Sequence, residues 1–165
     1  MDARKTAVEN TSETITVSRA YDAPRRLVFA AWSTAEHLAR WWGPHGFTAP
    51  ECVVEFRKGG RLEILMKGFG GGAGSAGDGR SPKGGALVEH WMRGTFDEIV
   101  DQERIAFTVF VEGAEGPIHT LVTFAESAGR TTMTVTQTVP KNPMMARGQV
   151  QGWTEQLERL AAELS

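Results

Sequence analysis

The side chains that could carry metal or covalent chemistry are scattered along this 165-residue chain. The single cysteine is Cys52, and the four histidines are His37, His45, His90 and His119. No two of them have the short spacing of a zinc site, and one cysteine cannot form an internal disulfide. The sequence therefore predicts no metal site, no cofactor and no catalytic residue set. Cys52 is expected to be a small buried hydrophobic residue.

His90 is the strongest candidate for a polar contact to a small molecule. It lies between Val88 and Met92 in an alternating stretch, on the apolar side that is expected to face inward. Its imidazole either binds a ligand or is hydrogen-bonded within the protein. Nucleophilic catalysis has little support, and acid–base chemistry on a bound molecule is the enzymatic alternative. The acidic residues Glu55, Glu63 and Glu89 fall on the outward side of their strands, which weakens that alternative.

The glycine-rich stretch 68–85 contains GAGSAG at residues 72–77, which has the formal spacing of a dinucleotide-binding motif. That motif requires a helix to open at its third glycine, because the helix N-terminus must meet the pyrophosphate. Here the chain continues with Asp-Gly-Arg-Ser-Pro, which does not open a helix. The stretch is predicted to be a flexible hairpin connection, with a lid over a cavity as the alternative.

Two short helices are predicted after the first strand. Asp22 is expected to cap the first helix and Ser33 the second. The second helix is expected to stop at Gly43, directly after the adjacent tryptophans Trp41 and Trp42. This arrangement places the two tryptophans at a helix end, with Trp42 expected at a cavity and Trp41 in packing.

The rest of the chain changes to the two-residue period of strands and then ends in a long helix. One strand is expected before the two short helices and six after them, each with one apolar and one polar face. A helix from about residue 143 to 164 is expected to cover the apolar face of the sheet. Gly148 and Gly152 in that helix either permit close packing on the sheet or leave room for a bound molecule.

Composition sets further limits on function. The formal net charge is -2 and the basic residues do not cluster, which argues against nucleic acid as a partner. No apolar run approaches the roughly 18 residues of a membrane span, and the polar N-terminus lacks the apolar segment of a signal peptide. The chain is expected to be a soluble, cytoplasmic monomer or homodimer. We expect a disordered N-terminal tail over 1–13 and a single domain over 14–165.

Four segments resemble one protein family when they are taken together. They are APRRLVFAAWSTAEHLARWWGP, FRKGGRLEI, GTFDEIVDQERIAFT and GWTEQLERLA. As a set they are similar to the bacterial proteins related to the C-terminal domain of the activator of the 90-kDa heat shock protein ATPase. That family is part of the START-like (SRPBCC) helix-grip superfamily, with polyketide cyclases and the birch-pollen allergen type of lipid carrier. The resemblance implies an α+β helix-grip fold, in which a curved antiparallel sheet of about six or seven strands wraps around the long C-terminal helix.

The resemblance also implies a hydrophobic cavity between the sheet and the long helix, without a shared catalytic residue set. The implied function is binding of a small hydrophobic or amphipathic ligand that is lipid-like, polyketide-like or aromatic, and binding without catalysis is favoured. A cyclase-, aromatase- or hydrolase-type enzyme and a cochaperone-like stress-response protein are the alternatives. His90 and Gln137 are the expected polar contacts. The implied ligand-binding residues are Trp42, Phe47, His90, Met92, Phe107, Val122, Gln137, Met145 and Trp153.

Overall fold

The computed structural model describes the backbone of residues 7–10, 14–70, 86–139 and 143–165, and the side chains of 14–68, 87–139 and 148–165. The prediction for the glycine-rich stretch 68–85 therefore falls mostly outside the described residues. In chain order the elements are β1 (Ala7–Asn10), β2 (Thr14–Tyr21), α1 (Arg25–Ala30), α2 (Ala35–Trp41), β3 (Phe47–Val54), β4 (Arg61–Gly70), β5 (Ala86–Val100), β6 (Arg104–Val111), β7 (Ile118–Ser127), β8 (Arg130–Thr138) and α3 (Pro143–Leu164).

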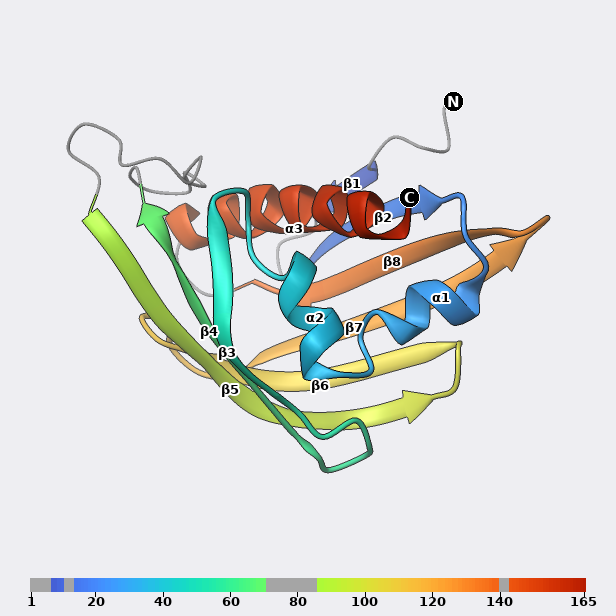
Figure 1. The fold of residues 1–165 in the computed structure, drawn as a ribbon. Helices are drawn as coiled ribbons and strands as arrows, with labels where there is room; N and C mark the ends of the chain where they lie inside the picture. Colours follow the sequence, from blue (N-terminus) through green and yellow to red (C-terminus); the bar gives the residue numbers. More distant parts are fainter. Residues whose placement is uncertain (1–6, 11–13, 71–85, 140–142) are drawn as a thin grey trace.

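These strands form one antiparallel sheet in the order β1-β2-β8-β7-β6-β5-β4-β3, and α3 lies across its concave side (Figure 1). The helix α1 packs on β7 and β8, and α2 lies between β3 and α3. The long strand β5 carries a bulge between Phe96 and Glu98, which bends the strand and helps the sheet to curve around the helix. The helix-grip fold expected from the sequence is confirmed.

The sheet has one strand more than the sequence predicts. β1 lies within the segment 1–13 that was expected to be a disordered tail, and it pairs with β2 so that Val8 is opposite Val17. Four residues in a polar segment are too few to show the alternation that identifies a strand. The pairing with β2 therefore becomes visible only in the folded chain.

Both predicted helix caps differ from the observed ones. α1 has no side-chain cap, because the Asp22 carboxylate instead pairs with the guanidinium of Arg130 at 2.7 Å. α2 is capped by Thr34 rather than by Ser33, since the Thr34 hydroxyl accepts a hydrogen bond from the backbone N–H of His37 at 3.1 Å. Serine and threonine offer the same hydroxyl, so adjacent candidates for a cap are hard to separate by sequence.

The hydrophobic core lies between the concave side of the sheet and the helices. Fully buried side chains come from both layers: Val17, Phe107 and Met133 belong to the sheet, and Leu157 and Leu160 belong to α3. Burial of apolar surface of this kind is the main favourable contribution to folding. The core thereby fixes α3 against the strands that position the candidate site.

Candidate functional site

Four tryptophans and a phenylalanine meet where α2 ends against α3. The ring centroid of Trp42 lies 5.7 Å from Trp32 and 5.5 Å from Trp153, both in edge-on contacts. Phe107 lies 6.5 Å from Trp42, and Trp41 packs on Trp32 at 4.9 Å. Each of these five side chains is at most 6 % exposed. The structure therefore brings three predicted site residues, Trp42, Phe107 and Trp153, into one packed aromatic cluster.

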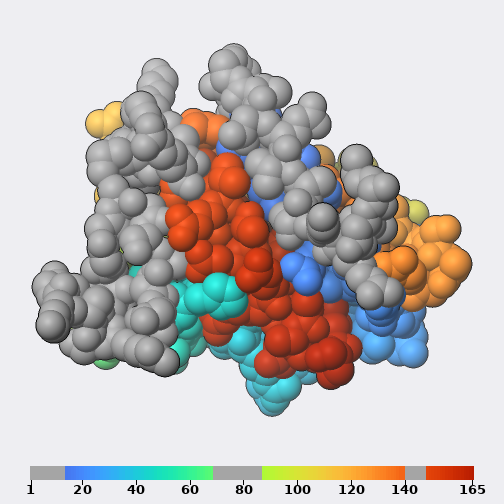
Figure 2. Space-filling view, turned by 90° about the horizontal axis from the view of Figure 1, so that it is seen from above, coloured from blue at the N-terminus to red at the C-terminus, as the bar shows by residue number. Residues whose placement is uncertain are grey.

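The turn after α2 is held by polar side chains of α3. Gly43 reverses the chain with φ at +97°, and the Oε1 atom of Gln156 accepts a hydrogen bond from its backbone N–H at 2.7 Å. The Nη1 atom of Arg159 donates to the backbone oxygens of Trp42 at 2.8 Å and Gly43 at 2.9 Å. It also lies 3.0 Å from the backbone oxygen of Phe47. Burial lowers the pKa of Arg159. Figure 2 shows the outer side of α3 at the molecular surface, with the segment after α2 against it.

Gln137, a predicted polar contact to a ligand, is hydrogen-bonded within the protein. Its Oε1 atom accepts from the indole N–H of Trp153 at 3.0 Å and from Nε2 of Gln149 at 2.6 Å. Its Nε2 atom donates to the hydroxyl of Thr120 at 2.6 Å. An indole nitrogen can only donate, which fixes the oxygen end of the Gln137 amide. This network ties β7 and β8 to the N-terminal half of α3.

His90 differs from the other predicted residues because the core encloses it only in part. It lies on β5 opposite Met66, and its ring is nearly parallel to that of Phe47, with 6.3 Å between the centroids. Burial lowers the pKa of His90, although the charge of Glu112 acts in the opposite direction. At neutral pH the imidazole is therefore uncharged and offers one donor and one acceptor nitrogen.

Four predicted lining residues remain. Three of them belong to the core, and the side chain of the fourth lies outside the described residues. Phe47, Met92 and Val122 are all buried. Met145 belongs to α3, but its side chain lies outside the described residues. The inward direction predicted for the sheet residues is therefore correct, and their side chains contribute to the core.

A flank of α3 has free space beside it. A Cβ atom built on Gly152 meets no atom of the described residues beyond its own surroundings in the helix within 4 Å. Gly152 lies one helical turn before Gln156, so it shares the side of α3 that reaches Gly43. A side chain at position 152 would therefore not clash with the described residues. Gln156 holds Gly43, and a Cβ atom built on Gly43 would meet Phe47 and Met66. We call Phe47, His90, Gly152 and Gln156 together the α3–β5 site.

The folded state is expected to lose stability as the pH drops below about 6.5, and His90 should account for part of this loss. Burial holds the pKa of His90 below its ordinary value in the folded state, whereas the unfolded chain protonates it near 6.5. Between the two pKa values the unfolded state binds more protons, so stability rises with pH across this window. In urea unfolding, His90→Gln should therefore gain stability relative to the wild type between about pH 7.5 and pH 5.5.

The matched control for this measurement is His37→Gln, because His37 lies on the exposed surface of α2. An identical response of the wild type and His90→Gln to pH would contradict the prediction.

A separate surface groove of about 310 Å³ lies where α1, α2 and the C-terminal end of α3 meet. It is lined by Leu27, Ala30, Ala31, His37, Arg40, Trp41, Glu163 and Leu164. Leu27 is 43 % exposed at its edge. The groove shares no residue with the α3–β5 site, and the sequence does not indicate it, because its walls come from three helices that meet only in the fold.

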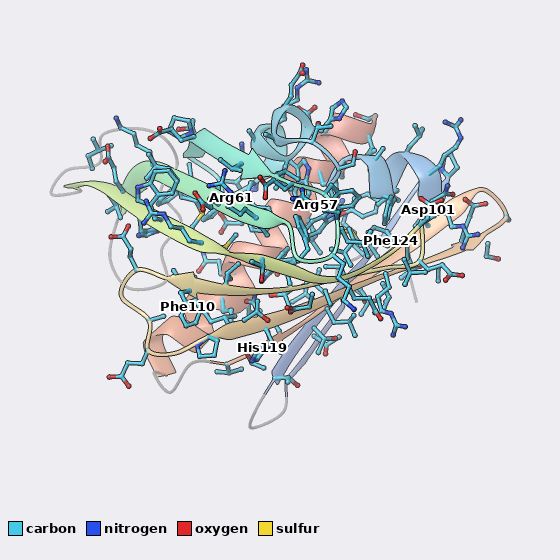
Figure 3. All side chains as sticks on the ribbon, turned by 90° about the horizontal axis from the view of Figure 1, so that it is seen from below. Arg57, Arg61, Asp101, Phe110, His119 and Phe124 are labelled. Carbon is cyan, nitrogen blue, oxygen red and sulfur yellow. The ribbon has the colours of Figure 1, made fainter. Side chains whose placement is uncertain are left out.

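The outer face of the sheet carries separate polar and aromatic side chains. Phe110 and His119 are exposed on this face (Figure 3), and His119 Nδ1 lies 2.8 Å from the hydroxyl of Thr108. Within the described ranges, no group of three or more His, Cys, Asp or Glu side chains could hold a metal ion. No helix in the same ranges is long and apolar enough to cross a membrane.

Cys52 is only partly buried, although it packs against the core as a small apolar side chain. It lies opposite Ile64 of β4, whose side chain faces the core. Burial raises the pKa of the Cys52 thiol to about 11, so the thiol is protonated at neutral pH. A protonated thiol is a poor nucleophile, which agrees with a packing role for Cys52.

Solved structures of low sequence identity share this fold. Protein CV1439 from Chromobacterium violaceum has a TM-score of 0.73 and 24% identity, over 92% of this chain and 96% of that protein. The AHSA1 protein SPO3351 from Silicibacter pomeroyi has a TM-score of 0.71 and 20% identity, over 92% and 96% of the two chains. CalU16 from Micromonospora echinospora has a TM-score of 0.64 and 17% identity, over 98% and 85%. These likenesses concern the fold alone.

Sequence comparison identifies the family directly. A search of curated proteins finds no match. The family described as activator of Hsp90 ATPase homolog 1-like protein matches residues 22–165, which include both short helices, the six strands after them and α3. The resemblance inferred from four sequence segments is thereby confirmed. The chain belongs to the family of activator of Hsp90 ATPase homolog 1-like proteins.

Proposed function

We propose that the protein binds a small apolar or amphipathic molecule at the α3–β5 site without catalysing a reaction. The observation that carries this proposal is the free space beside Gly152, on the flank of α3 that reaches the turn between α2 and β3. We place this activity in the cytoplasm, in a protein that is a monomer or a homodimer.

The glycine itself supports the proposal. A glycine in a helix interior costs about 1 kcal/mol relative to alanine. At Gly152 the surroundings have room for a methyl group, so packing gives no reason for the absence of a side chain. A molecule bound beside α3 would give a reason for the glycine, because a side chain at this position would occupy the space of that molecule. The neighbouring side chains Phe47 and Met66 offer an adaptable apolar wall, and the uncharged His90 offers a polar contact.

Gly152→Ala is expected to raise the free energy of unfolding by about 0.5–1 kcal/mol, because alanine is a better helix former and its methyl group meets free space. Urea unfolding measures the change. A lower free energy of unfolding for Gly152→Ala than for the wild type would contradict the free space that we assign to this flank of α3.

Gly152→Trp tests ligand binding itself, because an indole ring would occupy the site. Displacement of a fluorescent hydrophobic dye, together with native mass spectrometry of the freshly purified protein, should show binding by the wild type and at least about tenfold weaker binding by the variant. The matched control is Gln151→Trp, since Gln151 is exposed on α3. The absence of both dye binding and retained ligand in the wild type would rule out the proposed function.

A further inference from the structure

Among the described residues, two amide atoms on α3 are buried without a hydrogen-bond partner: Nε2 of Gln156 and Oε1 of Gln149. The Gln156 side chain is only 5 % exposed, so solvent does not satisfy its nitrogen. Buried polar groups in folded proteins almost always have a partner, and an unpaired one calls for an explanation. An unpaired donor and an unpaired acceptor on one helix are a ready pair of contacts for a ligand.

The identity of the two unpaired atoms follows from their neighbours. The Gly43 N–H can only donate, so the Gln156 atom 2.7 Å away must be the oxygen, which leaves the nitrogen unpaired. Nε2 of Gln149 lies 2.6 Å from Oε1 of Gln137 and 2.8 Å from the backbone oxygen of Thr138, which are both acceptors. Exchanging nitrogen and oxygen in either amide would bring two donors or two acceptors together.

The two unpaired atoms belong to residues on either side of the free space at Gly152. Gln149 and Gln156 are seven residues apart, which corresponds to two helical turns and about 10 Å along the axis. Gly152 lies between them on the same side of α3. Trp153, next to it, is buried and holds its indole against the aromatic cluster. An elongated molecule beside Gly152 would have an apolar middle and a polar atom at each end.

We propose that the ligand of the α3–β5 site is an uncharged molecule with a hydrogen-bond acceptor at one end and a hydroxyl group at the other. The acceptor, such as a ketone oxygen, binds Nε2 of Gln156, and the hydroxyl group donates to Oε1 of Gln149. Amides offer no countercharge, so a charged group placed at either glutamine would stay unpaired there. This inference rests on the proposed binding function and adds the chemistry of the ligand.

A matched pair of probes tests the Gln156 contact. 2-Acetylnaphthalene and 2-ethylnaphthalene have similar shapes, but only the first carries a carbonyl oxygen. In competition with a hydrophobic dye on the full chain, the wild type should bind the ketone about three- to tenfold more tightly than the hydrocarbon. Gln156→Met should remove this preference, so that the two probes bind the variant with similar affinities. Gln151→Met, on the exposed side of α3, should keep the preference.

A second pair tests the Gln149 contact. 2-Naphthol should bind the wild type about three- to tenfold more tightly than naphthalene, because its hydroxyl group donates to Oε1 of Gln149. Gln149→Met should remove this preference and leave the ketone preference in place. Each measurement is a ratio of two affinities in one variant. A general loosening of the site would weaken the binding of both probes, and it would not remove one preference while the other remains.

The outcomes separate this inference from the proposed function. If no naphthalene probe binds the wild type, the proposed function fails and the inference fails with it. If the probes bind but both ratios are the same in the wild type and the variants, binding stands and the inference is overturned. If Gln156→Met does not fold, Gln156→Glu at pH 8.5 keeps an oxygen for Gly43 and replaces the donor by a carboxylate oxygen. A retained ketone preference in that variant overturns the inference, and its loss supports it.

Discussion

Replacing Trp32 by alanine is expected to lower the free energy of unfolding by about 3–5 kcal/mol, the range for removing a large aromatic side chain from a packed core. Trp32 is only 1 % exposed, and it contacts Trp41, Trp42, Phe107 and Trp153. Its loss would leave a cavity in the middle of the aromatic cluster. Urea unfolding of the purified variant measures the change.

Trp91→Ala is the matched control, because Trp91 lies on the outer face of the sheet and stacks on Arg93 at 4.2 Å. Trp91 is only partly buried, so loss of this contact should change stability by about 1 kcal/mol, well below the effect of Trp32→Ala. Equal effects of the two substitutions would show that the aromatic cluster does not dominate the stability of the fold.

Arg159→Met is expected to lower the free energy of unfolding by about 2–4 kcal/mol. The methionine keeps the apolar stem of the side chain but removes the donors that bind the backbone oxygens of Trp42 and Gly43. Hydrogen bonds to a charged group contribute about 1.5–3 kcal/mol each, and partial exposure reduces that contribution here. The variant should also bind a hydrophobic dye differently, because the turn after α2 leads directly into Phe47 and the α3–β5 site.

The control for Arg159 is Arg40→Met. Arg40 pairs with Glu36 at 3.3 Å on the exposed side of α2, and such a pair is worth about 0.3–0.5 kcal/mol. Arg159→Lys should recover only part of the lost stability, because one ammonium group cannot reproduce the planar set of donors of a guanidinium. If Arg159→Met is as stable as Arg40→Met, the backbone contacts of Arg159 contribute little.

The fold could be predicted because alternation and helical spacing are properties of short stretches. Alternation alone predicts that Met92 lies on the inward side of its strand, and Met92 is buried. Gly43 was placed after α2 by composition, and its positive φ confirms the stop. Short-range patterns fail where neighbours compete or where a partner is distant. Thr34 competes with Ser33 for the cap, and β1 depends on its pairing with β2.

The contacts within the site could be predicted much less well, because they join residues far apart in the sequence. Gln137 was recognised as an inward polar residue, but its partners Thr120, Gln149 and Trp153 lie on β7 and α3. Arg159 was missed altogether, since its place on the flank of α3 has the spacing of a solvent-facing residue. In the sequence, only the position of Arg159 one helical turn after the inward-facing Gln156 indicates this contact.

The position of β3 at the end of the sheet has a consequence for self-association. An edge strand offers free backbone groups with which a second molecule can pair, and this is a common route to aggregation. Here Pro50 lies in the middle of β3 and lacks a backbone N–H, and the register with β4 shifts between Thr48 and Glu51. A regular intermolecular ladder cannot continue past such an interruption. The interruption at Pro50 thereby disfavours polymerisation of the chain through edge-to-edge pairing at β3.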